Sequence, residues 1–107
     1  INNPRSAVVR RDQYIKTIIR RGASVGANAT IVCGNELGEY CFIGAGSVVT
    51  KPVKPFALVA GNPARQIGWM SRHGEKLDLP LTGDGDAACP FTGEKYEVRE
   101  AICRLVT

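Results

Sequence analysis

The feature that most constrains the fold of this chain is an aliphatic residue at every sixth position. The series comprises Ile19, Val25, Ile31, Leu37, Ile43 and Val49. An α-helix cannot hold this series on one face, because six residues advance a helix by about 600° and the stripe drifts by about 120° per repeat. A coil with three flat sides of six residues returns the aliphatic residue to the interior at every side. The repeat therefore predicts a β-coil of triangular section.

The residues between the aliphatic positions have the properties that the corners of such a coil require. Four places after each aliphatic residue stands a small or compact one: Ala23, Ala29, Asn35, Cys41, Ser47 and Val53. The preceding places, where a corner needs a positive φ, hold Gly22, Asn28, Gly34, Tyr40, Gly46 and Pro52. Most of these are Gly or Asn, which tolerate that conformation best. An ordinary β-sandwich would instead show alternation with a period of two.

Turn-forming residues divide the chain into four parts. We expect a leading loop at 1–18, coils at 19–60, a connecting turn with a short helix or strand at 61–76, and a β-hairpin tail at 77–107. Pro52 and Pro55 are expected to close the end of the coil, because proline cannot donate to a following ladder. The chain begins at Ile1 and has no such cap before its first repeat, so we expect further coils upstream.

Composition restricts the class of protein. Of the 107 residues, 44% are hydrophobic and 22% charged, and no apolar run approaches the roughly 20 residues of a membrane span. The net charge is +4, but the 14 basic residues are scattered, so phosphorylated small molecules explain the charge as well as nucleic acid does, and a solvated basic surface without a ligand is the alternative. Four cysteines without a C-x-x-C pair indicate reduced thiols in the cytoplasm. A chain of this size buries only about two-thirds of its unfolded surface, so we expect an oligomer.

The segment VGANATIVCGNELGEYCFIGAGSVVTKPVKPFALVAGNPARQIG, residues 25–68, resembles the last coils of hexapeptide-repeat acyltransferases. Its strings IGAGSVVTK and GNPAR are specific for that class. With NPRSAV and RRGASVGANAT, the stretch 1–76 is similar to nucleotide-sugar N-acetyltransferases, above all those acting on UDP-2-acetamido-3-amino-2,3-dideoxyglucuronate. The resemblance implies an all-β fold, a left-handed parallel β-helix with a C-terminal extension that contains a short helix and a β-hairpin. It also implies a homotrimer with intersubunit sites.

The same resemblance implies an activity and a cofactor site. The activity is transfer of an acetyl group from acetyl-CoA to an amino group on a nucleotide-linked sugar, as in the synthesis of surface polysaccharide precursors. Ala27 and Ala45 would be outward positions whose backbone meets the pantetheine arm of CoA. Thr50, Lys51 and Arg65 would meet the phosphates and the adenosine end, for which a hydroxyl, an ammonium and a forked guanidinium are suitable donors. No metal is implied in this chemistry.

Acetyl transfer to an amine also needs an uncharged nucleophile, a proton acceptor and a donor for the oxyanion. The single histidine, His73, lies beyond the coils, where a surface position is expected. Either the base lies in upstream residues, or the amine binds neutral and needs little help. Asn3 stands near, without clearly aligning with, the place where the family has a substrate-contacting asparagine. Arg5 is a candidate contact for a substrate phosphate or carboxylate.

The tail is similar to a zinc ribbon that has lost its ligands. Some relatives have C-x-C-G before it and C-x-x-C-G after it, the spacing of a four-thiolate zinc site. The matching residues here are Ser71, His73, Cys89 and Thr92, so we expect a ribbon that keeps its turns without metal. The alternative to an active enzyme is a truncated trimeric remnant that binds CoA without turnover. A γ-type carbonic anhydrase would need three zinc-binding histidines, and the chain has one.

Overall fold

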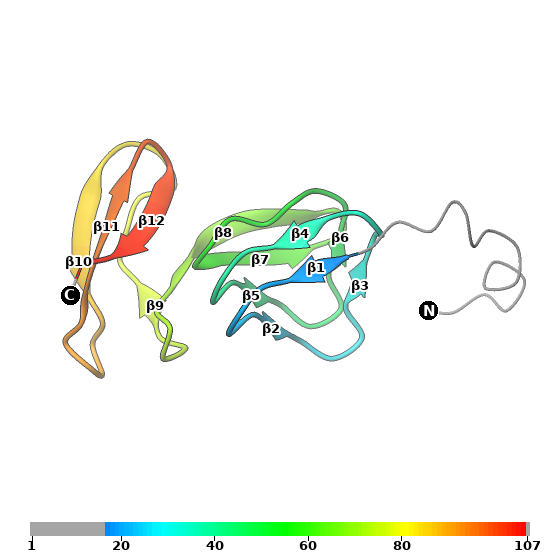
Figure 1. The fold of residues 1–107 in the computed structure, drawn as a ribbon, viewed down its shortest axis with the longest axis horizontal. Helices are drawn as coiled ribbons and strands as arrows, with labels where there is room; N and C mark the ends of the chain where they lie inside the picture. The colour runs from blue at the N-terminus through cyan, green and yellow to red at the C-terminus, as the bar shows by residue number, and fades with distance from the viewer. Residues whose placement is uncertain (1–16, 107) are drawn as a thin grey trace, which may run out of the picture.

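The computed structural model describes residues 17–106, and all regular structure in that range is β-strand (Figure 1). The first six strands are two residues long: β1 (Ile18–Ile19), β2 (Ser24–Val25), β3 (Thr30–Ile31), β4 (Glu36–Leu37), β5 (Phe42–Ile43) and β6 (Val48–Val49). The described residues contain no helix with the length and apolarity to cross a membrane.

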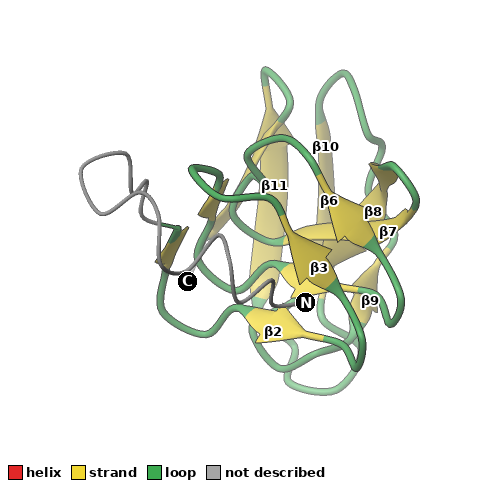
Figure 2. Cartoon of the chain, turned by 90° about the vertical axis from the view of Figure 1, so that its right-hand side faces the viewer, coloured by secondary structure: helices red, strands yellow, loops and turns green. Residues whose placement is uncertain are grey.

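The six short strands form a parallel coil with three strands in each turn. β1 pairs with β4, β2 with β5 and β3 with β6. Each pair is offset by 18 residues, as in Val25 opposite Ile43, so every aliphatic repeat position stacks on one in the next turn. Figure 2 shows β2 and β3 on different sides of the coil. The pairing agrees with the repeat, since 18 is three times six.

The corners of the coil adopt the backbone conformation that their residue types favour. Five of the six predicted corner positions have φ between 58° and 90°: Gly22, Asn28, Gly34, Tyr40 and Gly46. Pro52 does not, because its ring holds φ near −65°. Gly22 also needs to lack a side chain, since a Cβ there would lie 2.3 Å from the ring of Tyr40.

Burial of the aliphatic positions increases along the coil. Leu37 and Ile43 are fully buried and Val49 is 2% exposed, whereas Ile19 and Val25 are 57% and 44% exposed. Among the described residues, β1 and β2 have a strand partner on one edge only. The aliphatic series therefore forms a closed core in the second turn, and its first members lie at an open end of the described coil.

The coil continues past the two prolines that we expected to close it. Val53 lies between them and forms a parallel bridge with Leu37. Its N–H donates to the carbonyl of Glu36, so the prolines occupy positions where no ladder donor is needed. Strand β7 (Ala57–Gly61) then pairs in parallel with β5, with Phe42 opposite Leu58. This offset is 16 residues, two fewer than in the preceding turns, so the last turn, which contains both prolines, is shorter.

The segment 61–76 was predicted to contain a short helix or strand and contains a strand, so the short helix expected in the C-terminal extension is absent. Residues Ala64–Met70 form strand β8, antiparallel to β7, and β9 (Lys76–Leu77) adds to its far edge. Arg65 and Ile67 are exposed and alternate with the less exposed Ala64 and Gln66, which is a strand period. The free edge of β7 offers hydrogen bonds to a chain that turns back tightly, and Gly68 disfavours a helix. Tertiary pairing therefore decides the conformation of this segment.

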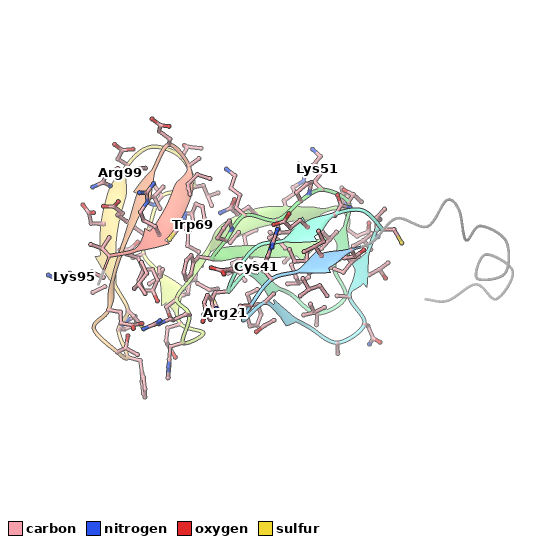
Figure 3. All side chains as sticks on the ribbon, in the orientation of Figure 1. Arg21, Cys41, Lys51, Trp69, Lys95 and Arg99 are labelled. Carbon is pink, nitrogen blue, oxygen red and sulfur yellow. The ribbon has the colours of Figure 1, made fainter. Side chains whose placement is uncertain are left out.

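The tail is a three-stranded antiparallel sheet of β10 (Gly85–Ala88), β11 (Lys95–Arg99) and β12 (Ile102–Leu105). It extends the expected hairpin by one strand. Trp69 lies between coil and tail, fully buried, and its indole N–H donates to the carbonyl of Pro80 at 2.8 Å (Figure 3). Phe56 of the last corner packs edge-on against Tyr96, with ring centroids 5.4 Å apart. An aromatic core therefore joins the two parts.

Two isoleucines provide a matched test of where the stability of the coil originates. Ile43→Ala should lower the free energy of unfolding by about 3 kcal/mol, because it removes a fully buried side chain from a core that cannot collapse around the cavity. Ile67→Ala should cost less than about 1 kcal/mol, because Ile67 is 53% exposed on β8. Chemical denaturation of both variants measures the difference, and equal losses would contradict this account of the core.

Candidate functional site

A cavity of about 360 Å³ lies where the chain leaves β6, at the end of the coil. Two segments line most of it, residues 49–54 after β6 and residues 63–66 at the start of β8. The predicted cofactor residues Thr50, Lys51 and Arg65 all line this cavity, although Arg65 is far from the other two in sequence. The hairpin of β7 and β8 brings the two segments together, because it returns the chain to the coil end.

The charge of the cavity suits an anionic ligand. Its described lining contains three cations, Lys51, Lys54 and Arg65, and no acidic residue. Thr50, Lys51 and Arg65 are exposed, and Lys51 projects from the coil in Figure 3. A hydroxyl, two ammonium groups and a planar guanidinium can donate hydrogen bonds to phosphate oxygens. Lys54 and Gln66 line the cavity but were not predicted for this site. Lys54 could have been found, because it is the second lysine of the string KPVK that begins with Lys51.

Ala27 and Ala45 lie outside this cavity, at the corners before β3 and β6. Both are exposed. They belong to successive turns, and the N–H of Gly46 donates to the carbonyl of Ala27 at 2.9 Å. Ala45 precedes β6 and Thr50 follows it. The predicted contacts for the pantetheine arm and those for the phosphates therefore lie at opposite ends of one side of the coil. Asn3 and Arg5 fall outside the described residues.

The thiols and the histidine of the described chain have no place in the cavity. Cys41 is buried at its corner, and this burial raises the pKa of its thiol to about 11, so the thiolate is scarce at neutral pH. Cys33 is exposed. His73 is exposed in the tail, where its ring stacks on Phe91 with centroids 4.5 Å apart. None of these residues lines the cavity, so its described lining offers no evident general base.

Known proteins with similar sequences are acetyltransferases. The chain is 42% identical over 91 residues to the dTDP-3-amino-3,6-dideoxy-alpha-D-galactopyranose 3-N-acetyltransferase of Aneurinibacillus thermoaerophilus, covering 85% of this chain and 45% of that protein. It is 50% identical over 61 residues to the serine acetyltransferase of Escherichia coli K12, covering 57% of this chain and 22% of that protein. The chain is homologous to hexapeptide-repeat acetyltransferases. It spans less than half the length of these relatives.

Solved structures of hexapeptide-repeat acetyltransferases agree with this relationship. A galactoside acetyltransferase in complex with coenzyme A matches with a TM-score of 0.52 and 32% identity, covering 55% of this chain and 30% of that structure. The serine acetyltransferase of Vibrio cholerae O1 matches with a TM-score of 0.51 and 45% identity, covering 51% and 21%. No model of a known protein family matches the chain.

Two facing turns, one in the connecting segment and one in the tail, lie at the positions expected for a zinc ribbon. In the first, the N–H of Ser71 donates to the carbonyl of Glu75, and the N–H of Gly74 donates to the carbonyl of Ser71. In the second, the N–H of Cys89 donates to the carbonyl of Glu94, and the N–H of Gly93 donates to the carbonyl of Cys89. The Cys89 thiol donates to the Ser71 hydroxyl across the gap, with Sγ and Oγ 3.4 Å apart. The two turns are therefore closed by a hydrogen bond.

The side chains of these turns do not fit a structural zinc ion. Zinc sites of this kind use thiolates and imidazoles, whereas Ser71 and Thr92 offer neutral hydroxyls. The described residues contain no group of three or more His, Cys, Asp and Glu that could hold a metal. Burial raises the pKa of the Cys89 thiol, but its hydrogen bonds with Ser71, Thr92 and nearby backbone groups outweigh this effect and lower the pKa to about 7. The turns thus favour ionisation of the Cys89 thiol, but they do not supply the three further ligands that a structural zinc ion needs.

Restoring the missing thiolates should restore metal binding. Ser71→Cys, His73→Cys and Thr92→Cys combined with native Cys89 would present four thiolates from two turns. The present separation of Oγ and Sγ, 3.4 Å, is close to the roughly 3.8 Å between two sulfurs on one tetrahedral zinc. We expect one Zn²⁺ per chain, and thiolate-to-Co²⁺ charge-transfer bands on cobalt substitution. The parent chain is the control, and a triple variant without these bands would mean that the turns are too far apart.

Proposed function

We propose that this chain supplies the cofactor site of an acetyl-CoA-dependent N-acetyltransferase that acts on an amino sugar carried by a nucleotide. The observation that carries the proposal is the cavity at the end of the coil, which gathers Thr50, Lys51 and Arg65 and has no acidic residue in its described lining. The relationship to acetyltransferases supports it from the sequence side. The name of the Aneurinibacillus relative, a 3-N-acetyltransferase of a dTDP-linked amino sugar, supports the class of acceptor.

Each predicted cofactor residue has a definite task in this proposal. Lys51 neutralises phosphate charge as a mobile point cation, and Arg65 binds phosphate oxygens in a bidentate manner. Thr50 donates its hydroxyl to the same end of the cofactor. Ala27 and Ala45, at the other end of that side of the coil, present backbone and small side chains to the pantetheine arm. CoA would then lie along the coil, with its thioester directed away from the cation cluster.

The reaction follows from the chemistry of the two substrates. The lone pair of the neutral sugar amine attacks the thioester carbonyl, and the carbon–sulfur bond breaks as the tetrahedral intermediate collapses. The amine nitrogen loses a proton and the departing CoA sulfur gains one, which gives an amide and free CoA. Because the described lining offers no evident base, proton transfer depends on upstream residues or on an amine that binds uncharged. Asn3 and Arg5 remain the proposed acceptor contacts.

The architecture that we propose around this site is a left-handed coil assembled as a homotrimer in the cytoplasm. The repeat, with its parallel pairs offset by 18 residues, supports the coil, and the kinship with hexapeptide-repeat acetyltransferases supports its hand. In such a trimer a neighbouring subunit would complete the site at the end of the coil. Residues 1–18 would lead into the coils at 19–60, and residues 61–76 would connect them to the tail at 77–107.

Titration of CoA tests the site directly. Lys51→Ala and Arg65→Ala should each weaken CoA binding about tenfold, because each removes about 1.4 kcal/mol of charge-assisted hydrogen bonding to phosphate. Lys76→Ala and Arg104→Ala remove exposed cations that do not line the cavity and should leave the affinity unchanged. Calorimetry with light scattering measures affinity and assembly together. Unchanged affinity in both site variants would refute the assignment, and CoA binding without turnover of any amino sugar would favour a non-catalytic remnant.

A further inference from the structure

Lys54 connects the tail to the candidate cofactor cavity. It lines that cavity with Lys51 and Arg65, and it also lines the neighbouring hollow that contains Glu36 and Glu39. Its ammonium donates to the backbone carbonyl of Ala101, with Nζ and O 3.0 Å apart. Ala101 is 47 residues further along the chain. A turn of the tail therefore holds the position of a cation at the rim of the cavity.

The turn that provides this carbonyl has an unusual backbone for its residues. Arg99 pairs with Ile102, which leaves a two-residue turn of Glu100 and Ala101 between β11 and β12. Both turn residues have positive φ, 54° and 61°. Such turns usually contain Asn-Gly or Asp-Gly, because other residues are strained there. A strained turn that places its carbonyl on a cation is consistent with a role beyond connecting two strands.

The contact holds the ammonium of Lys54 without neutralising it. A carbonyl is an uncharged acceptor, whereas a carboxylate would cancel the charge. On the neighbouring side, the carboxylate of Glu36 is already paired with Arg20, at 2.7 Å between Oε2 and Nε. An ammonium has three N–H donors and Ala101 accepts one of them. Lys54 can therefore keep its bond to the tail while it donates to an anion in the cavity.

We propose that Lys54 is a third cation for the phosphates of the bound cofactor, and that the β11–β12 turn is the element that positions it. This inference rests on the proposed CoA site. It gives the tail a task in cofactor binding, although the tail residues themselves do not line the cavity. Because coupling between two sites is reciprocal, a cofactor that binds Lys54 also stabilises the turn that holds it.

The test compares CoA binding by the full chain and by variants of Lys54. Lys54→Met keeps the length of the side chain and removes the charge, so CoA should bind about tenfold more weakly. The dependence of the affinity on salt should also become shallower. Lys54→Arg should recover most of the affinity, and Lys76→Met should behave like the parent chain. Circular dichroism and thermal melting establish that each variant is folded.

Hydrogen exchange provides a readout of the turn itself. CoA should slow amide exchange in β11 and β12 of the parent chain, and this protection should be lost in Lys54→Met. If Lys51→Ala weakens CoA binding but Lys54→Met does not, the role of Lys54 is overturned and the cofactor site stands. If Lys54→Met weakens CoA binding but CoA does not slow amide exchange in β11 and β12 of the parent chain, the positioning role of the turn is overturned. If the parent chain does not bind CoA, the proposed function fails together with this inference.

Discussion

The rest of the structure depends on the stacking of aliphatic side chains from one turn of the coil onto the next. Two-residue strands cannot form a stable sheet alone, because each contributes few hydrogen bonds against the entropy of ordering the corners. Burial of Leu37, Ile43 and Val49 in register with the preceding turn supplies the missing free energy. The 18-residue turn keeps that register as far as β6, where the chain leaves the coil and the candidate cavity begins.

Much of the coil, and part of the site, could be predicted because both depend on local sequence. A period of six specifies which side chains point inward, and Gly or Asn at the corners specifies where φ is positive. Tyr40 belongs to the same corner series although its residue type gives little sign of it. Thr50 and Lys51 were assigned to the cofactor site by motif resemblance and not by the repeat, which describes only the coil that they leave together. Their convergence with Arg65 came from motif resemblance, since periodicity does not describe the return of the chain in β8.

The failed predictions concern positions where a distant partner decides the local structure. The short helix expected in the C-terminal extension is absent, and residues 64–70 adopt the strand alternative because β7 offers them an unpaired edge. The prolines at 52 and 55 looked like a stop, yet Val53 between them still reaches Glu36 and Leu37. Lys54 was missed for the same reason, because the tail carbonyl that holds it comes from a turn 47 residues away. Long-range pairing, rather than composition, separates the expected fold from the observed one.

Links within the protein itself hold the tail sheet in place. Its two turns are joined by the Ser71–Cys89 hydrogen bond and by the ion pair of Arg72 with Glu94. These links are weaker than four zinc–thiolate bonds, so the tail depends more on packing against the coil. Trp69 and Tyr96, both essentially buried, provide that packing. The tail is also linked to the cavity at the coil end, because Lys54 lines that cavity and its ammonium donates to the carbonyl of Ala101.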